Sequence, residues 1–192
     1  MWRIVASIGQ VRRRKGSFMK KICEALAATP LFDGLNHDLF HDVCVKTSIR
    51  LVWKGEVLAN EGDPCTGIGI IVEGQLAMQK YSSSGDFATL ELLGAGEVFG
   101  EYLIFGSRHT YTVTIEAVTN SKVVFISRET LTGLLYQNPK LMQNFLAILS
   151  DRVHAQNRRL SLLSQKSLRQ KIASYLLEML HDQLEEEGRS PK

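Results

Sequence analysis

The sequence predicts a mainly β protein with flanking helices: a double-stranded β-helix (jelly roll) followed by a long dimerisation helix. Between Ile49 and Ser127, short apolar or alternating runs are separated by turns that contain glycine, and this spacing is typical of a barrel or jelly roll. From Pro139 onward the apolar residues recur at steps of four and three, which is the period of a helix with one narrow seam. A chain of 192 residues, 44% of them hydrophobic, can bury one core and a smaller appendage.

The first 18 residues form a separate basic segment. They carry five Arg or Lys residues and no acidic residue, whereas the rest of the chain holds 18 basic residues against 20 acidic ones. The rest is therefore slightly acidic and is no obvious binder of a phosphate backbone. The basic segment has three interpretations: a nucleic-acid arm, an organellar transit segment, or a disordered or non-native leader. We favour a leader with a native start at Met19, because a helical pattern follows that residue directly.

Two short helices are expected before the strands. Residues 19–28 place Ile22, Leu26 and Cys23 on one face of a predicted helix, and a second helical turn is expected around residues 38–47. About eight strands then follow, the usual number for a jelly roll. Clear examples are the runs Ile68–Val72, Gln75–Met78 and Lys122–Ile126.

The cysteines and the hydropathy restrict the class of protein. Cys23, Cys44 and Cys65 lie too far apart for a zinc knuckle or an iron–sulfur run, and their odd number argues against a disulfide framework. We therefore expect reduced thiols in a cytoplasmic protein. No run of eighteen apolar residues is present, so neither a membrane span nor a membrane partner is expected.

The predicted long helix, residues 139–164, carries a heptad seam. Its positions are Met142, Leu146, Leu149, Val153, Gln156, Leu160 and Leu163. Such a seam needs a partner surface, and an ordinary core-facing helix would find it in the roll. The stripe here is narrow, because charged residues such as Asp151 and Arg159 interrupt it, and a narrow stripe favours a two-stranded coiled coil. We expect a homodimer, in which Gln156 either fixes the register or faces something bound.

A last helix is expected from Ser167 to about Glu186, after a break that follows Ser164. Its apolar face consists of Ile172, Leu176, Met179 and Leu180. No later segment is available to cover this face. We therefore expect the chain to be cut inside a second domain.

The turn around Gly100 suits an anion. A glycine lets a ligand approach the backbone closely, and the apolar run after Glu101 can form one helical turn with exposed N–H groups at its start. Glu101 could accept hydrogen bonds from a ribose hydroxyl, and Arg108 could bind a phosphate with two parallel donors. An ordinary surface turn with a solvated arginine is the alternative.

Several motifs occur in order along the chain. They are the paired glycine turns in 54–58 and 61–64, the strand and turn in 70–76, the glycine–glutamate turn in 96–101 and the start of the last helix in 171–173. Together they resemble the Crp/Fnr family of bacterial regulators and, more broadly, cyclic-nucleotide-binding domains. The likeness covers roughly residues 24 to 187.

The resemblance implies three parts after the basic leader: a β-roll at 19–138 that holds a small-molecule effector, a dimerisation helix at 139–164, and the first helix of a winged helix-turn-helix domain at 165–192. Full-length members of the family read DNA with that domain as a two-fold dimer. The recognition helix is absent from the sequence, so contact with DNA is expected only through the missing C-terminal domain. The chain is then the effector-sensing and dimerisation portion of a transcription regulator.

The resemblance also implies where the effector binds. The expected ligand-binding residues are Gly100, Glu101, Tyr102, Arg108, His109, Thr110, Gln156 and Asn157. In the family's cyclic-nucleotide binders the phosphate arginine comes later after the glutamate and is followed by two small residues. His109, Thr110 and Tyr111 stand at these three positions here. A cyclic nucleotide is therefore kept as one option and is not favoured, and the cofactor is left unassigned.

Other functions fit the residues less well. A haem ligand at His109 or His154 competes with the more common role of a hydrogen-bonded or solvated histidine. A cupin-type enzyme needs clustered metal ligands, and His37 and His41 lack a third. Neither a metal site nor enzyme activity is expected. The remaining alternative is a stand-alone cyclic-nucleotide-binding module that acts through protein contacts, and a monomeric state would favour it.

Overall fold

The computed structural model describes residues 22–35, 47–82, 85–165 and 167–186. The basic leader, Met19 and the helical turn predicted from 38 lie outside these ranges, apart from Thr47. The chain divides into two compact units, the first ending at Leu146 and the second beginning at Ala147. Each unit is described by itself below.

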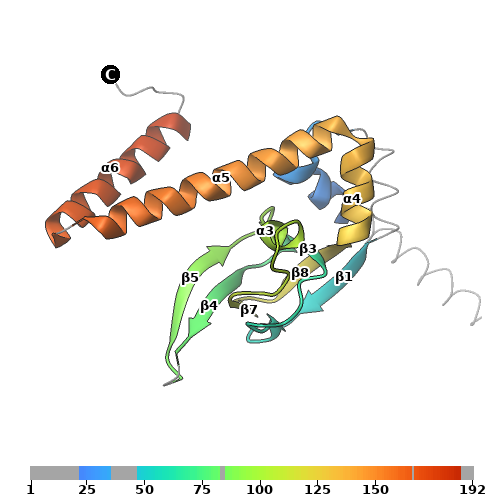
Figure 1. Ribbon diagram of the computed structural model, residues 1–192, viewed down its shortest axis with the longest axis horizontal. Helices are drawn as coiled ribbons and strands as arrows, with labels where there is room; N and C mark the ends of the chain where they lie inside the picture. The colour runs from blue at the N-terminus through green and yellow to red at the C-terminus, as the bar shows by residue number, and fades with distance from the viewer. Residues whose placement is uncertain (1–21, 36–46, 83–84, 166, 187–192) are drawn as a thin grey trace, which may run out of the picture. The chain divides into compact units, whose positions relative to one another are not determined.

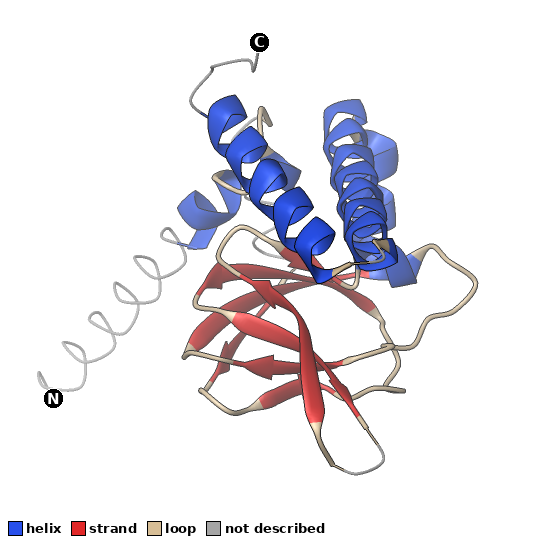
Figure 2. Cartoon of the chain, turned by 90° about the vertical axis from the view of Figure 1, so that its left-hand side faces the viewer, coloured by secondary structure: helices blue, strands red, loops and turns tan. Residues whose placement is uncertain are grey.

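The first unit contains eight strands in two four-stranded antiparallel sheets (Figure 1), which confirms the predicted jelly roll. One sheet has the order β1-β8-β3-β6 and the other β2-β7-β4-β5. Figure 2 shows the strands of both sheets wrapping around one interior. Their bounds are β1 Ser48–Val52, β2 Val57–Ala59, β3 Gly67–Glu73, β4 Leu76–Tyr81, β5 Phe87–Leu93, β6 Val98–Phe99, β7 Thr114–Ala117 and β8 Ser121–Ser127.

Strand β3 has two differently filled faces. Successive side chains of a strand point to opposite faces, so Ile68 and Ile70 lie on one face with their partners Ile126 and Val124 on β8, and all four are fully buried. The opposite face carries Gly69 and its β8 partner Phe125, and it lines a cavity described below. The sheet therefore supplies a solid apolar layer on one side and a hollow on the other.

Helix α4, Arg128–Gln137, packs against β8 and β3 and was not predicted from the sequence. The Ser127 hydroxyl caps it by accepting a hydrogen bond from the Thr130 backbone N–H at 3.2 Å. Its buried residues are Leu131, Leu134 and Leu135, at the spacing of one helix face. The helix joins the last strand of the roll to the long helix.

Helix α5, Pro139–Ser164, confirms the predicted long helix, and its first part belongs to the first unit. Leu141 and Phe145 are buried there, and the Phe145 ring meets the edge of Phe105 with the ring centres 5.7 Å apart. The Asn144 side-chain amide donates to the carbonyls of Leu31 at 3.1 Å and Asp33 at 2.8 Å. These bonds fix the short 3-10 helix η1, Pro30–Phe32, to α5.

The second unit contains the rest of α5 and helix α6, Leu168–Glu186, as predicted. The break between them ends in a reciprocal cap. The Ser167 hydroxyl accepts from the Gln170 N–H at 3.2 Å, and the Gln170 side-chain oxygen accepts from the Ser167 N–H at 3.3 Å. Within the described residues, no helix is long and apolar enough to cross a membrane.

The prediction of reduced thiols holds for Cys65 and is wrong for Cys23. Cys65 is free and buried, but Cys23, in the helical turns at 22–27, is disulfide-bonded. Pairing depends on which Cβ atoms meet in space. Spacing along the chain does not contain that information, so counting the cysteines could not reveal the bond.

Candidate functional site

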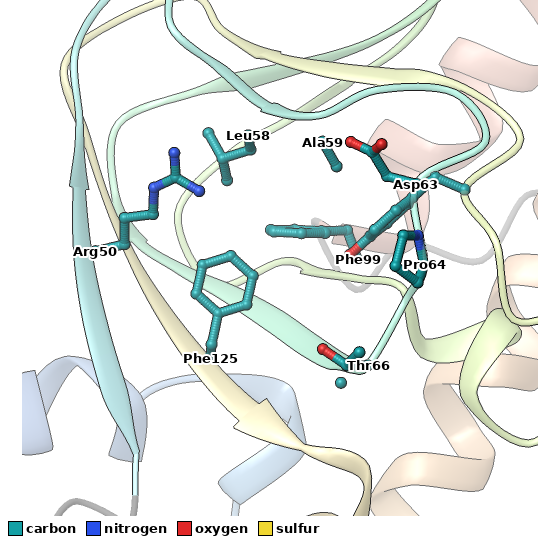
Figure 3. A pocket seen from close by; sticks show the side chains of 10 residues that line it. Arg50, Leu58, Ala59, Asp63, Pro64, Thr66, Phe99 and Phe125 are labelled. Carbon is teal, nitrogen blue, oxygen red and sulfur yellow. The ribbon is translucent and has the colours of Figure 1, made fainter.

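A cavity of about 300 Å³ opens in the roll, with lining residues from both sheets (Figure 3). Strands β1, β3, β6 and β8 contribute from one sheet and β2 from the other, and the loops before β3 and β7 complete the lining. The lining residues are Arg50, Leu58, Ala59, Asp63, Pro64, Thr66, Gly67, Phe99, Tyr111 and Phe125. This set is mainly apolar and carries few polar groups, as is usual for sites that bind small molecules.

Two aromatic rings of the pocket depend on one glycine. Phe99 on β6 and Phe125 on β8 both pair in register with Gly69 of β3, and their rings meet edge to face with the centres 5.8 Å apart. A Cβ atom on Gly69 would lie 2.1 Å from the Phe99 ring. Any side chain there would displace the ring. Gly69 therefore allows Phe99 and Phe125 to form one side of the pocket, the aromatic wall.

Arg50 is the cation among the described lining residues. It stands on β1, and its Nη2 donates to the Glu56 carboxylate at 3.0 Å. The other Glu56 oxygen accepts from the Trp53 backbone N–H at 3.0 Å. This backbone hydrogen bond, followed by the bond to Arg50, lowers the pKa of Glu56. The Arg50 side chain remains 45% exposed, so its remaining N–H groups can reach a ligand.

Asp63 is the acidic lining residue, and hydrogen bonds to Asn60 and to the backbone of Tyr111 hold its turn in place. Its carboxylate accepts from the Asn60 N–H at 2.7 Å and from the Asn60 side-chain amide at 3.3 Å. Its carbonyl accepts from the Tyr111 N–H at 2.9 Å, and the Gly62 N–H donates to the Tyr111 carbonyl at 2.8 Å. The loop before β3 is thereby joined to the segment before β7.

Tyr111 is 7% exposed and lies beside Cys65 and Gly100. A Cβ atom on Gly100 would be 3.1 Å from the Cys65 sulfur and 3.5 Å from the Tyr111 hydroxyl. Burial, followed by the neighbouring Cys65, strongly raises the pKa of Tyr111, and the negative charge of Glu101 adds to the rise. The phenol therefore stays neutral at physiological pH.

The predicted anion turn forms as expected in its backbone. Gly100 adopts a left-handed conformation with φ of 81°, and helix α3, Glu101–Ile104, begins directly after it. Glu101 is 1% exposed. Tyr102 is partly exposed, and its hydroxyl lies 3.4 Å from that of Thr112.

The three predicted residues after α3 have different surroundings. Arg108 is exposed and makes no hydrogen bond or ion pair in the described part of the chain. His109 lies with Nδ1 2.9 Å from the Leu103 carbonyl, and its Nε2 is 3.2 Å from the Arg128 guanidinium. Thr110 is exposed and forms a β-bridge with Pro64. The contacts of His109 are those of a hydrogen-bonded structural histidine.

The remaining predicted ligand-binding residues, Gln156 and Asn157, are exposed in the second unit. None of the eight residues predicted to bind the effector lines the pocket, and their role stays a prediction. Sequence reasoning missed Arg50, Phe99 and Phe125. The available signal was an arginine and two phenylalanines inside strand patterns, but without the strand pairing nothing indicated that they meet.

The structure shows no metal centre in the parts of the chain it describes. Among those residues, no group of three or more His, Cys, Asp or Glu side chains could hold a metal ion. The histidine with the best-defined contacts, His109, is engaged by a carbonyl and a guanidinium.

Comparisons with known proteins agree with this architecture. A family profile described as "Cyclic nucleotide-binding domain" matches residues 49–138. The chain is 27% identical over 161 residues to the cyclic AMP receptor protein of Thermus thermophilus, covering 83% of this chain and 73% of that protein. It is 26% identical over 141 residues to the fumarate and nitrate reduction regulatory protein of Vibrio cholerae, covering 73% of this chain and 55% of that one. These relatives are transcription regulators, in agreement with the prediction that the chain is not an enzyme.

Solved structures give the same result. The catabolite activator protein of Thermus thermophilus superposes with a TM-score of 0.62 at 26% identity, over 71% of this chain and 63% of that chain. The sensor domain of the regulator DNR from Pseudomonas aeruginosa shares the fold, with a TM-score of 0.64 at 22% identity, over 79% of this chain and 99% of that one. The roll of this chain therefore matches the model of cyclic nucleotide-binding domains over residues 49–138 and is similar in sequence and fold to regulators of the Crp/Fnr type.

Proposed function

We propose that the chain is the effector-sensing and dimerisation portion of a Crp/Fnr-type transcription regulator that works in the cytoplasm. The observation that carries the proposal is the pocket inside the roll. It combines a hollow of about 300 Å³ with the aromatic rings of Phe99 and Phe125 and with two charged groups, Arg50 from β1 and Asp63 from the loop before β3. A largely apolar hollow with few polar groups is the usual form of a site for a small molecule.

Dimerisation is supported by the exposed seam of α5. Leu146, Val153, Leu160 and Leu163 are between 53% and 68% exposed in the single chain. A row of large apolar side chains at heptad spacing is stabilised when a second helix covers it, and burying each leucine contributes about 1.5–3 kcal/mol. The proposed partner is a second copy of this chain, which presents the same row.

The pocket is connected to the dimerisation helix through consecutive elements of the chain. Phe125 lines the pocket on β8, α4 begins three residues later, and α5 begins two residues after α4 ends. An effector that prefers one arrangement of these elements shifts their population toward it. In the proposed regulator, that shift would reach a DNA-binding domain of which α6 is the first helix. The apolar face predicted for α6 supports this, because Ile172, Leu176, Met179 and Leu180 are all exposed.

A cyclic nucleotide does not fit the residues at the glycine–glutamate turn. A cyclic phosphate carries a negative charge and needs a cation beside it. Arg108 does not line the pocket, and the buried group beside Gly100 is Tyr111, whose raised pKa keeps it neutral. The buried Glu101 carboxylate would add repulsion in its charged form. We therefore derive no step through a cyclic nucleotide.

The oligomeric state tests the proposal. Light scattering of the full chain is expected to give the mass of a dimer, and Leu160→Glu is expected to give a monomer. Ser161→Glu is the matched control, because Ser161 is exposed on the same helix outside the seam. A wild-type monomer at high protein concentration would contradict the proposal and favour a stand-alone module.

A second experiment tests the proposal that a cyclic nucleotide does not fit the glycine–glutamate turn. Cyclic AMP and cyclic GMP, titrated by calorimetry, are expected to give no heat above dilution. Saturable binding that is lost in Arg108→Ala would show that the turn binds phosphate after all.

A further inference from the structure

The pocket carries one positive and one negative side chain, whereas a site for a phosphate needs positive charge alone. Arg50 and Asp63 both line it, and Figure 3 shows their charged groups on opposite sides, with aromatic and aliphatic side chains between and below them. We propose that the effector is a small monocarboxylic acid with an apolar body, whose carboxylate binds Arg50. The inference rests on the proposed function, because it names the ligand class of the same sensing pocket.

Arg50 is suited to a carboxylate. Its guanidinium is a planar fork with five N–H donors that matches two carboxylate oxygens. One nitrogen, Nη2, is engaged by Glu56 at 3.0 Å, and both side chains are about one third to one half exposed, at 45% and 35%. Exposed ion pairs of this kind are weak. A ligand carboxylate can therefore share or replace this contact at low cost.

The rest of the lining selects an apolar body. Phe99 and Phe125 form an edge-to-face wall, and Leu58, Ala59 and Pro64 add aliphatic surface. Apolar surface that leaves water for such a wall stabilises a complex in proportion to its area. The hydrocarbon portion of the acid would supply that surface, and a ligand consisting of the anion alone would not.

Asp63 limits the charge that the pocket accepts. Its carboxylate lies across the pocket from Arg50, and its bonds to Asn60 fix its place. A second negative group at the far end of a ligand would face this carboxylate, with a further penalty for leaving water. A monoacid is therefore preferred over a diacid of the same length, and over a phosphate that carries two charges.

The experiment compares matched ligands by calorimetry and thermal shift on the full chain. The probes are hexanoate, 3-phenylpropionate and benzoate, each beside its neutral primary amide, with adipate as the diacid that has the chain length of hexanoate. At least one monoacid is expected to bind at least about tenfold more tightly than its amide, the ratio given by a charge-assisted bond. Adipate is expected to bind more weakly than hexanoate. Equal binding of acid and amide, or tighter binding of adipate, would overturn the proposal, as would the failure of all three monoacids.

Variants locate the site. Arg50→Ala is expected to weaken binding of the preferred acid about tenfold or more, and Arg50→Lys to restore part of it, because a lysine keeps the charge without the fork. Arg169→Ala removes the same charge from an exposed position in the second unit and is the matched control. Leu58→Trp is expected to block the hollow. Unchanged binding in both Arg50→Ala and Leu58→Trp, with unaltered circular dichroism, would place the acid elsewhere and overturn the assignment.

The two proposals fail separately. A chain that is dimeric but binds none of the monoacids retains the sensing and dimerisation role while losing this ligand class. A chain that binds a monoacid through Arg50 but stays monomeric retains the ligand class while losing the dimeric regulator.

Discussion

Helix α5 carries a similar apolar repeat in two stretches that differ in burial. In the first stretch, up to Leu146, the core-facing residues Leu141 and Phe145 are buried within the first unit. In the second stretch, from Ala147, the seam residues Val153 and Leu160 are exposed. They continue the row that begins with the exposed Leu146, which lies one residue round the helix from the buried Phe145. Periodicity therefore indicates that a face needs covering but does not say whether the same chain or another chain covers it.

The difference separates two kinds of stability. Contacts of the first stretch contribute to the folding of one chain, and their loss lowers stability at every protein concentration. Contacts proposed for the second stretch are made only in a dimer, so they depend on concentration by mass action. Substitutions in the two stretches are expected to differ in this dependence.

The largest effect is expected for Phe145→Ala. Phe145 is 2% exposed and meets the edge of Phe105, and truncating a buried phenylalanine costs about 3–5 kcal/mol. Chemical denaturation should show this loss equally at low and high protein concentration. Phe145→Leu is the control and should lose less, because it leaves a smaller cavity. A loss that shrinks as the protein is concentrated would mean that Phe145 acts mainly in the dimer.

The next loss of stability is expected for Leu160→Ala, and unlike that of Phe145→Ala it should depend on protein concentration. A dimer would lose three carbons from each of two leucine side chains in its seam, which corresponds to about 3–5 kcal/mol. The melting temperature should fall at high concentration and stay nearly unchanged at a concentration where the wild-type chain is monomeric. Ser161→Ala, beside it on the exposed surface, should behave as wild type. A concentration-independent loss in Leu160→Ala would remove the distinction between the two stretches.

Most of the fold could be predicted because its signals are local. The glycine turns and alternating runs predicted about eight strands, and the four–three spacing predicted α5. Helix α4 was missed although Ser127 and the spacing of Leu131, Leu134 and Leu135 are a cap and a helix face. The preceding strand and the following Pro139 leave only a short interval, in which one and a half turns of apolar pattern are hard to separate from a loop.

The site was harder to predict because it depends on strand pairing. Gly100 and the helical turn at Glu101 follow from neighbouring residues, and both form as expected. The pocket instead brings together Arg50 and Phe125, from two strands far apart in the sequence that the sheet places side by side. No residue near Arg50 in the sequence indicates that an aromatic ring lies across from it.

A smaller effect is expected for Asn144→Ala, which tests the first stretch through polar groups. The Asn144 amide donates to the carbonyls of Leu31 and Asp33, and buried acceptors that lose their donor cost about 1–3 kcal/mol. The loss should again be independent of concentration, as for Phe145→Ala. Gln143→Ala, at the adjacent exposed position, is the control. If both variants were equally stable, the hydrogen bonds between α5 and η1 would contribute nothing measurable.

The smallest effect is expected for Ser167→Ala, which concerns only the start of α6 in the second unit. Its hydroxyl accepts from the Gln170 N–H, and removing such a cap costs about 1 kcal/mol. Because the cap acts within one helix, the loss should appear as faster hydrogen exchange of the Gln170 amide, with no change in the melting of the roll. Ser167→Asp keeps an acceptor at the cap and should restore protection. Unchanged exchange in Ser167→Ala would mean that α6 begins without help from this side chain. A loss of dimer mass in the same variant would instead extend the interface of the second stretch beyond α5.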